Sequence, residues 1–415
     1  MERRGRSRTR DAISLNLLLS SVRGVLVRRR LVIAVIVLAL LLAAGAAIYW
    51  VATAQFGPKF VFSVAGDFGS WNGFTEGLRQ LNKTGSDFAF ALGDLSYGGK
   101  TEQAWCAKFR ETFVNVGVLA GNHDTGAPPY LPDGTWEGNI NNYTESCPFP
   151  LNAPLTGDYG KQYYFDYPSM NPIARFVLIS PDLVFAVDNG EHYNYSVGSP
   201  RYTWTAKAID GARSAGVPWV IVGMHKNCIA AGEHECEIGP DLLNLLIEKK
   251  VDLILQAHTH NYERSKQLVL NSGSCPAINE HVYIPACVAH DGADGQYRKG
   301  DGAVLVISGT GGRDLDSFNS SNPLAQYFAA RMDNATVGNG KGVVTFTVEP
   351  SRITMRTSFN GTYADGFAIA QSVDVLANLE NPLALALVGS AVVVVASAVL
   401  WNRSRRKRRG WQPEE

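Results

Sequence analysis

The chain of 415 residues lacks an excess of charge of either sign, because 38 Lys and Arg residues are balanced by 38 Asp and Glu residues. Without a net charge, its overall field does not favour nucleic acid or any other polyanion as a partner. The chain also lacks internal repeats and low-complexity linkers, which argues against a repeat array. With 46% apolar residues, it has enough apolar side chains for one large compact domain.

Cysteine is scarce, and the six cysteines do not have the CxxC spacing that is typical of thiolate metal sites. This pattern favours disulfides, and the short separations suggest Cys228–Cys236 and Cys275–Cys287, although other pairings stay open. Disulfides indicate an oxidising compartment outside the cytoplasm. Potential N-glycosylation sites, which predict a glycoprotein if the domain is exported, occur at Asn82, Asn142, Asn194, Asn319, Asn334 and Asn360.

Two long runs, residues 31–54 and 383–401, contain no charged residue. About 20 apolar residues suffice for a helix to cross a membrane, so both runs are predicted to be transmembrane helices; a cleaved signal peptide is the alternative for the first. Basic clusters flank both runs and place both termini in the cytoplasm, because positive residues concentrate on that side. The predicted order is a basic cytoplasmic segment (1–30), a transmembrane helix (31–54), a catalytic domain outside the cell membrane (55–378), a second transmembrane helix (383–401) and a basic cytoplasmic tail (402–415).

Short apolar, β-branched runs within 55–378 end in glycine and polar residues, which is typical of strands buried on both faces. Helix-compatible stretches separate several of them, at 73–81, 102–115, 203–215 and 240–250. This alternation predicts an α/β sheet. Three later segments, 343–350, 351–360 and 366–373, have the pattern of antiparallel strands joined by turns.

Polar residues follow five of the predicted strands directly. The motifs are GDFG, GDLSYGG, GNHD, GMHKN and QAHTH, and their candidate residues are Asp67, Asp94, Tyr97, Asn122, His123, Asp124, His225, His258 and His260. Ligands of open α/β sheets gather beyond the carboxyl ends of strands, so these side chains are expected in one crevice. Carboxylate, phenolate, amide and imidazole donors suit iron, manganese or zinc.

This succession of motifs, ending in AHTHNYER, resembles the calcineurin-like metallophosphoesterase superfamily and, within it, the purple acid phosphatases. Two details indicate the subgroup: Asp67 is followed by Phe68 and Gly69 where many members have DxH, and Tyr97 occupies the position of the purple phosphatases' tyrosinate. Ala257 departs from the family, which often has glycine there. The resemblance implies a four-layer α/β/β/α sandwich with two central mixed β-sheets, to which the sequence adds the two flanking transmembrane helices.

The resemblance also implies the ligands of two metal ions, expected to be Fe(III) and a divalent ion (Fe, Zn or Mn). Asp67, Tyr97 and His260 would bind the first ion; Asn122, His225 and His258 would bind the second; Asp94 would bridge them. For His123 the family implies phosphate binding and assistance to the leaving group, and Asp124 is expected to orient it. His234, nine residues after His225, matches a second, outer histidine of small purple phosphatases or is an exposed loop residue.

The sequence thus predicts a membrane-anchored phosphatase that hydrolyses small phosphate monoesters by attack of a metal-activated hydroxide. A phosphodiesterase or nucleotide hydrolase on the same metal core is one alternative. A membrane-tethered ectodomain without catalysis is another, which retention of all seven candidate ligands disfavours, because clustered buried charges are costly. Nucleic acid is not expected as a partner, since basic runs beside apolar segments usually signal topology.

Overall fold

The computed structural model describes residues 33–42, 45, 58–69, 71–97, 100–126, 137–232 and 234–371. Residues 58–372 form one compact unit. Its helices are α2 (Trp71–Asn82), α3 (Glu102–Thr112), α4 (Ile140–Ser146), α5 (Pro200–Ser214) and α6 (Pro240–Glu248), with short 3₁₀ helices η1 (Asn122–Asp124), η2 (Ala186–Asp188), η3 (Pro285–Cys287) and η4 (Pro323–Tyr327).

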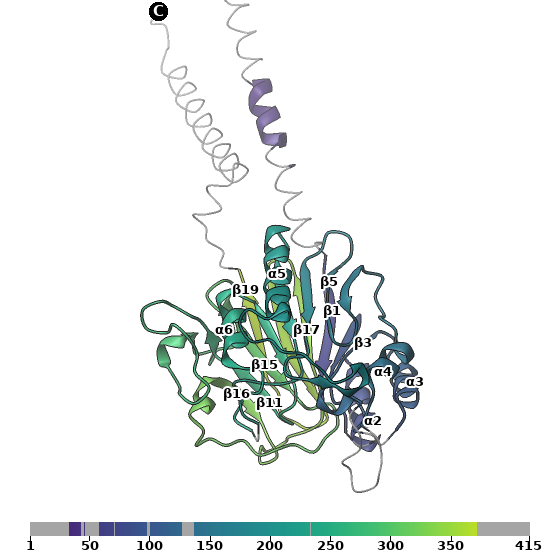
Figure 1. Ribbon diagram of the computed structural model, residues 1–415. Coiled ribbons are helices and arrows are strands. Elements are labelled where there is room, and N and C mark those ends of the chain that lie inside the picture. Colours follow the sequence, from purple (N-terminus) through teal and green to yellow (C-terminus); the bar gives the residue numbers. More distant parts are fainter. Residues whose placement is uncertain are drawn as a thin grey trace, which may run out of the picture. The chain divides into compact units, whose positions relative to one another are not determined.

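Two large mixed sheets form the centre of the domain (Figure 1). The seven-stranded sheet has the order β14 (Gln296–Arg298), β19 (Gly366–Ala370), β18 (Arg352–Phe359), β17 (Gly342–Glu349), β1 (Phe60–Ala65), β2 (Phe88–Leu92) and β3 (Val116–Leu119). The eight-stranded sheet has the order β16 (Phe328–Met332), β11 (Tyr262–Ser265), β15 (Val304–Ser308), β10 (Leu253–Gln256), β9 (Trp219–Gly223), β6 (Ala174–Leu178), β5 (Gln162–Tyr167) and β4 (Leu155–Asp158). Two small hairpins pair β7 (Val184–Phe185) with β8 (Glu191–His192) and β12 (Gln267–Leu268) with β13 (Val288–His290).

Alternate side chains of the central strands enter two different cores, because successive residues of a strand point to opposite faces. In β2, Phe88 and Phe90 belong to the core between the two sheets, whereas Ala89 and Ala91 belong to the core under the helices. Helix α2 packs on β17 and β18, and α5 packs on β6 of the other sheet. Helices therefore cover the outer faces, and the predicted α/β/β/α layering is present in the domain.

The four predicted helices are confirmed as α2, α3, α5 and α6, and the three late strands as the antiparallel β17, β18 and β19. Parallel pairing of β1 with β2, β2 with β3, and β9 with β10 directs the carboxyl ends of these strands to the same edge of each sheet. Helix α4 was not predicted.

The predicted pair of transmembrane helices is corrected by the structure. Within the described ranges, no helix is long and apolar enough to cross a membrane. Residues 33–42 are helical; a helix of this length rises about 15 Å, roughly half the hydrocarbon thickness. The other residues of the first run, apart from 45, and the whole of 383–401 lie outside the described residues. The described residues 58–371 therefore form the metallophosphoesterase sandwich, and the part of the chain that the structure describes does not support the two flanking spans.

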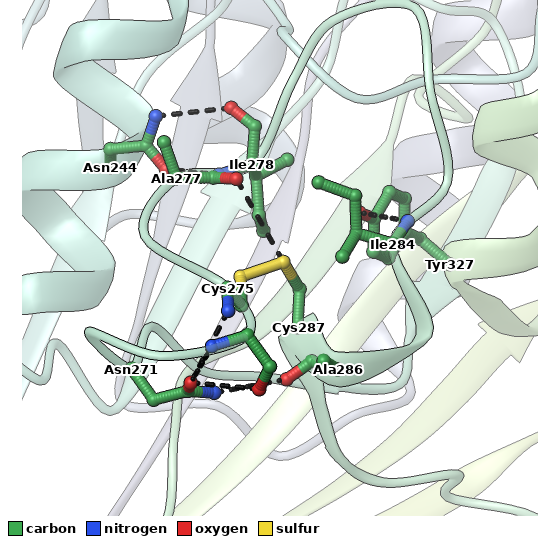
Figure 2. The surroundings of a disulfide bond; sticks show 10 residues. Asn244, Asn271, Cys275, Ala277, Ile278, Ile284, Ala286, Cys287 and Tyr327 are labelled. Carbon is green, nitrogen blue, oxygen red and sulfur yellow. Dashed lines mark hydrogen bonds between the residues drawn. A yellow bond between two sulfur atoms is a disulfide. The ribbon is translucent and has the colours of Figure 1, made fainter.

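All six cysteines form disulfides within the domain. Cys228–Cys236 and Cys275–Cys287 were suggested by their spacing and are confirmed, and Cys106–Cys147 joins α3 to the end of α4. Figure 2 shows Cys275–Cys287 closing a loop whose backbone also pairs at Asn271, where the Asn271 N–H donates to the Cys275 carbonyl over 2.8 Å. These crosslinks fix long connections outside the two sheets.

Candidate metal centre

The five motifs meet where the ends of the two sheets adjoin. Asp67 follows β1, Asp94 and Tyr97 follow β2, and Asn122 lies in η1 after β3, all from the seven-stranded sheet. From the eight-stranded sheet, His225 follows β9, and His258 with His260 follows β10. The structure therefore brings together all seven residues predicted as metal ligands.

Three of these residues form a first group of donors. The Tyr97 hydroxyl donates to Asp67 Oδ1 over 3.0 Å and lies 3.1 Å from His260 Nε2. His260 Nε2 is also 3.4 Å from Asp67 Oδ1. A phenol oxygen, a carboxylate oxygen and an imidazole nitrogen thus converge within hydrogen-bonding distances of one another.

A second group of donors surrounds His225 Nε2. This atom is 3.1 Å from Asn122 Oδ1, 3.2 Å from Asp94 Oδ1 and 3.2 Å from His258 Nδ1. Asp94 also acts on Tyr97 of the first group, where burial, Asp67 and Asp94 together raise the pKa of the phenol well above its ordinary value. Asp94 therefore acts on both groups.

Hydrogen bonds outside the second group set which imidazole nitrogens face it. His225 Nδ1 lies 2.7 Å from the Leu92 carbonyl oxygen, so this nitrogen carries the proton and Nε2 remains for a cation. His258 has the opposite arrangement: its Nε2 lies 2.9 Å from Glu237 Oε1, and its Nδ1 faces the donors. The two ligand nitrogens are thereby selected by their outer partners.

His260 has a carboxylate partner as well. Its Nδ1 lies 3.5 Å from Asp316 Oδ1, and its backbone N–H donates to Asp316 Oδ2 over 2.9 Å. Sequence reasoning missed both Glu237 and Asp316, because neither directly follows a strand of the motif series. Histidine ligands of metals commonly pair with carboxylates. Acidic residues in the loops near the predicted histidines were therefore the signal in the sequence that could have identified these two acids.

The protonation equilibria of the centre indicate a site built for cations. Burial opposes ionisation of Asp94, but His225 and His123 outweigh it and hold the pKa of Asp94 below its usual range. Burial likewise disfavours charged imidazoles, yet nearby carboxylates raise the pKa of His225 to about 9 and that of His260 to about 10. Protons on imidazoles thus supply the positive charge that buried carboxylates require, and the donor set fits two metal cations in their place.

Four candidate ligands have left-handed backbone conformations, which are uncommon for residues other than glycine. The φ angles are 60° at Asp67, 52° at Asp94, 48° at Tyr97 and 67° at His258. Such conformations cost energy and persist where the surrounding structure enforces them, which is frequent at functional sites. The tight turns after β1, β2 and β10 therefore direct these side chains into the centre.

Close backbone packing explains two small residues of the motifs. A Cβ atom at Gly121 would lie 2.1 Å from Asp94 Oδ1, so only glycine fits beside this carboxylate. At Gly66 an added Cβ would lie 2.5 Å from the Cβ of Ala257, the residue that departs from the family pattern. Alanine is therefore accommodated at position 257 because position 66 has no side chain.

His123 lies at the edge of the centre with 28% of its side chain exposed. Its Nε2 is 3.8 Å from Asp94 Oδ2, and its Nδ1 is 3.2 Å from Glu137 Oε1. Asp124 instead accepts the N–H groups of Gly121 (2.9 Å) and Leu95 (3.1 Å), so its carboxylate holds the turn of η1. The acid beside the His123 imidazole is Glu137, which the sequence reading missed.

His234 lies beside the second group. Its ring stacks on His258 with centroids 3.7 Å apart, and its Nδ1 is 3.2 Å from Glu237 Oε1. The His234 side chain is 30% exposed. The Cys228–Cys236 disulfide holds the loop that carries it. His234 thus lies on this loop and at the rim of the second group.

The domain is similar to known phosphoesterases in sequence and in structure. The family described as "Calcineurin-like phosphoesterase" matches residues 60–262. Purple acid phosphatase 18 of Arabidopsis thaliana is 24% identical over 282 residues, 65% of this chain and 59% of that protein. The Fe(3+)-Zn(2+) purple acid phosphatase 12 of the same plant is 29% identical over 103 residues, 22% of each chain.

A solved structure also resembles the domain. The purple acid phosphatase PPD1 from yellow lupin (Lupinus luteus) seeds aligns with a TM-score of 0.52 and 20% identity, over 77% of this chain and 55% of that chain. The chain thus spans about half the length of the relatives it matches. The likeness to this structure shows the shared fold.

The family match, the relatives and the fold agree with the donor geometry and support a metallophosphoesterase domain. Residues 60–262 of the chain therefore match the calcineurin-like phosphoesterase family, and the chain is similar to plant purple acid phosphatases.

Proposed function

We propose that this chain is a phosphatase that hydrolyses small phosphate monoesters outside the cytoplasm. The observation that carries the proposal is the convergence of seven donors in two groups that share Asp94, with each imidazole held by an outer acceptor. Strained ligand backbones argue against a binding protein without catalysis, because strain costs stability that a purely structural domain has no reason to lose.

The two groups would hold different ions. Asp67, Tyr97 and His260 would hold ferric iron, since a hard trivalent ion stabilises a phenolate, and Asn122, His225 and His258 would hold a divalent ion. The name of the related Fe(3+)-Zn(2+) enzyme supports this combination. When bound, two such cations lower the pKa of a water molecule and offset the charge of the phosphoryl oxygens.

The side chains at the rim serve the substrate. His123 lies beside Asp94 and faces solvent in part, so a protonated imidazole there can hydrogen-bond a phosphoryl oxygen and deliver a proton to the leaving oxygen. Glu137 lies beside the Nδ1 side of the ring, where it can orient the imidazole. His234 lies across the second group, where it can hold a second phosphoryl oxygen.

An assay of the full chain tests this proposal. Metal content is measured first, and hydrolysis of p-nitrophenyl phosphate and bis(p-nitrophenyl) phosphate is then followed between pH 4 and 8. We expect turnover of the monoester, and its loss in Asp94→Asn. A folded, metal-loaded chain that hydrolyses neither ester would contradict the proposal, and preference for the diester would make it a phosphodiesterase.

The metal assignment has a separate test. Tyrosinate bound to ferric iron absorbs visible light, so the oxidised protein should be violet and Tyr97→Phe should be colourless. A colourless wild-type protein with zinc or manganese in both positions would refute the iron assignment and leave hydrolysis unaffected.

The proposed location is supported by the three disulfides, which persist in oxidising compartments. Exposed asparagines at several of the potential glycosylation sites, including Asn194 and Asn319, agree with export. Labelling of thiols in intact cells, before and after reduction with an impermeant reductant, checks it. Fully reduced cysteines in freshly lysed cells would contradict an extracytoplasmic domain.

A further inference from the structure

A pocket of about 190 Å³ borders the metal centre at Tyr97. The segment after β2 contributes Tyr97 and Lys100, and the loop after β15 contributes Arg313. Aromatic rings of α2 and α3, among them Trp71 and Trp105, form the walls. Because Tyr97 reaches the first donor group with its hydroxyl, a substrate bound at the metals can extend along this ring into the pocket.

The pocket contains two cations and no described acid. The Arg313 guanidinium carbon lies 4.5 Å from the centre of the Tyr97 ring, and Lys100 Nζ lies 5.3 Å from the centre of the Trp71 ring. Both side chains are exposed, and in the described ranges neither forms an ion pair with a carboxylate. Their charge is therefore available to a ligand.

A buried donor independently indicates a ligand. The Trp105 side chain is 1% exposed, and its Nε1–H has no acceptor among the residues that the structure describes. The ring is fixed by stacking on Phe74, with centroids 5.2 Å apart, and by edge contact with Tyr143. An unpaired buried donor costs about 1–3 kcal/mol, which an acceptor atom in the pocket would recover.

Two cations and an unpaired N–H donor select an anion with acceptor oxygens. Since the pocket adjoins the centre that would bind the scissile phosphoryl group, we propose that it binds a second phosphoryl group of the same substrate. The preferred substrates are then compounds that carry a second phosphoryl group next to the scissile one, such as a nucleoside diphosphate, rather than simple monoesters. This inference rests on the proposed phosphatase function and specifies its substrate class.

The experiment compares ADP with AMP, which differ by one phosphoryl group, in the full chain. We expect a higher kcat/KM for ADP in the wild type. Arg313→Gln should reduce kcat/KM for ADP about tenfold and for AMP less than about twofold, as expected for one lost charge-assisted contact. Lys100→Gln should show the same selectivity. Lys207→Gln, which removes an exposed lysine of α5, is the matched control and should change neither.

Equal loss on both substrates, or no loss on ADP, would overturn the inference while the wild-type turnover still supports the proposed function. If the wild type hydrolyses neither nucleotide nor p-nitrophenyl phosphate, the proposed function fails. Calorimetric measurement of pyrophosphate and orthophosphate binding then tests whether the pocket binds a second phosphoryl group. Tighter binding of pyrophosphate, reduced in Arg313→Gln, supports the inference; equal binding of the two anions refutes it.

Discussion

Replacing Glu237 by glutamine should release one metal selectively. Glu237 lies 2.9 Å from His258 Nε2 and 3.2 Å from His234 Nδ1, and Lys226 Nζ lies 2.8 Å from its other oxygen. Burial opposes its ionisation, but hydrogen bonds from His234, His258 and Lys226 outweigh burial and hold the pKa of Glu237 below its ordinary range. The acid is therefore a carboxylate that fixes the tautomer of His258.

The size of the effect follows from this geometry. His258 is one of four donors in the second group, and Glu237 orients it from the nitrogen that faces away from the donors. Loss of such an outer partner typically weakens metal binding about 10–100-fold, or about 1.4–2.8 kcal/mol. The first group contains no contact to Glu237, so its ion, and any colour due to Tyr97, should remain.

Metal content after dialysis against a graded series of chelator, together with the visible spectrum, measures both effects. Asp182→Asn is the matched control, because Asp182 also binds Lys226, over 2.9 Å, but does not contact a ligand histidine. Equal metal retention in Glu237→Gln and Asp182→Asn would refute the reasoning. So would simultaneous loss of both ions, since it would show that Glu237 supports the whole centre.

Three further changes test other features. Glu137→Gln removes the acid 3.2 Å from His123 Nδ1 and should lower kcat on the order of tenfold with KM nearly constant and a shifted pH profile; an unchanged profile would contradict its positioning role. Removing the Cys106–Cys147 disulfide by alanine at both positions should cost about 4 kcal/mol of unfolding free energy, from a sequence separation of 41 residues, and a cost near zero in urea unfolding would contradict this. Burial raises the pKa of Glu263 to about 8, so the folded state loses stability as pH rises from the unfolded pKa towards 8. Glu263→Gln should flatten this decline in urea titrations, and an identical slope would refute it.

Much of the fold followed from local pattern. The apolar runs that end in GD, GNHD or HTH were predicted as buried strands because they are short, apolar and bounded by turn residues. The structure buries Phe88 and Phe90 in one core and Ala89 and Ala91 in the other, as such strands require. The prediction of two transmembrane helices was wrong. It rested on the length and apolar composition of the two charge-free runs, and the described residues contain no such helix. The length of an apolar run does not by itself establish a helix that spans a membrane.

The sequence did not predict the roles of three acids, because these roles depend on distances in space; the acids are Glu137, Glu237 and Asp316. Each lies on a connection whose path is set by other elements, such as the Cys228–Cys236 loop that precedes Glu237 directly. The same holds for Asp124, which seemed to serve His123 by adjacency but binds the backbone of its own turn and Leu95. Neighbours in sequence on a tight turn point in different directions.

From the sequence by itself, the residue types after each strand predicted that these donors meet in one crevice, and the resemblance to the purple acid phosphatases implied two metal ions. Only the tertiary structure decided how they are arranged: which nitrogen of each histidine faces the donors, which acids support them, and that Arg313 and Lys100 meet beside Tyr97. The physical reason is that the type of each side chain fixes which donor atoms it offers. The orientation of these side chains and their electrostatic support come from residues that are distant along the chain.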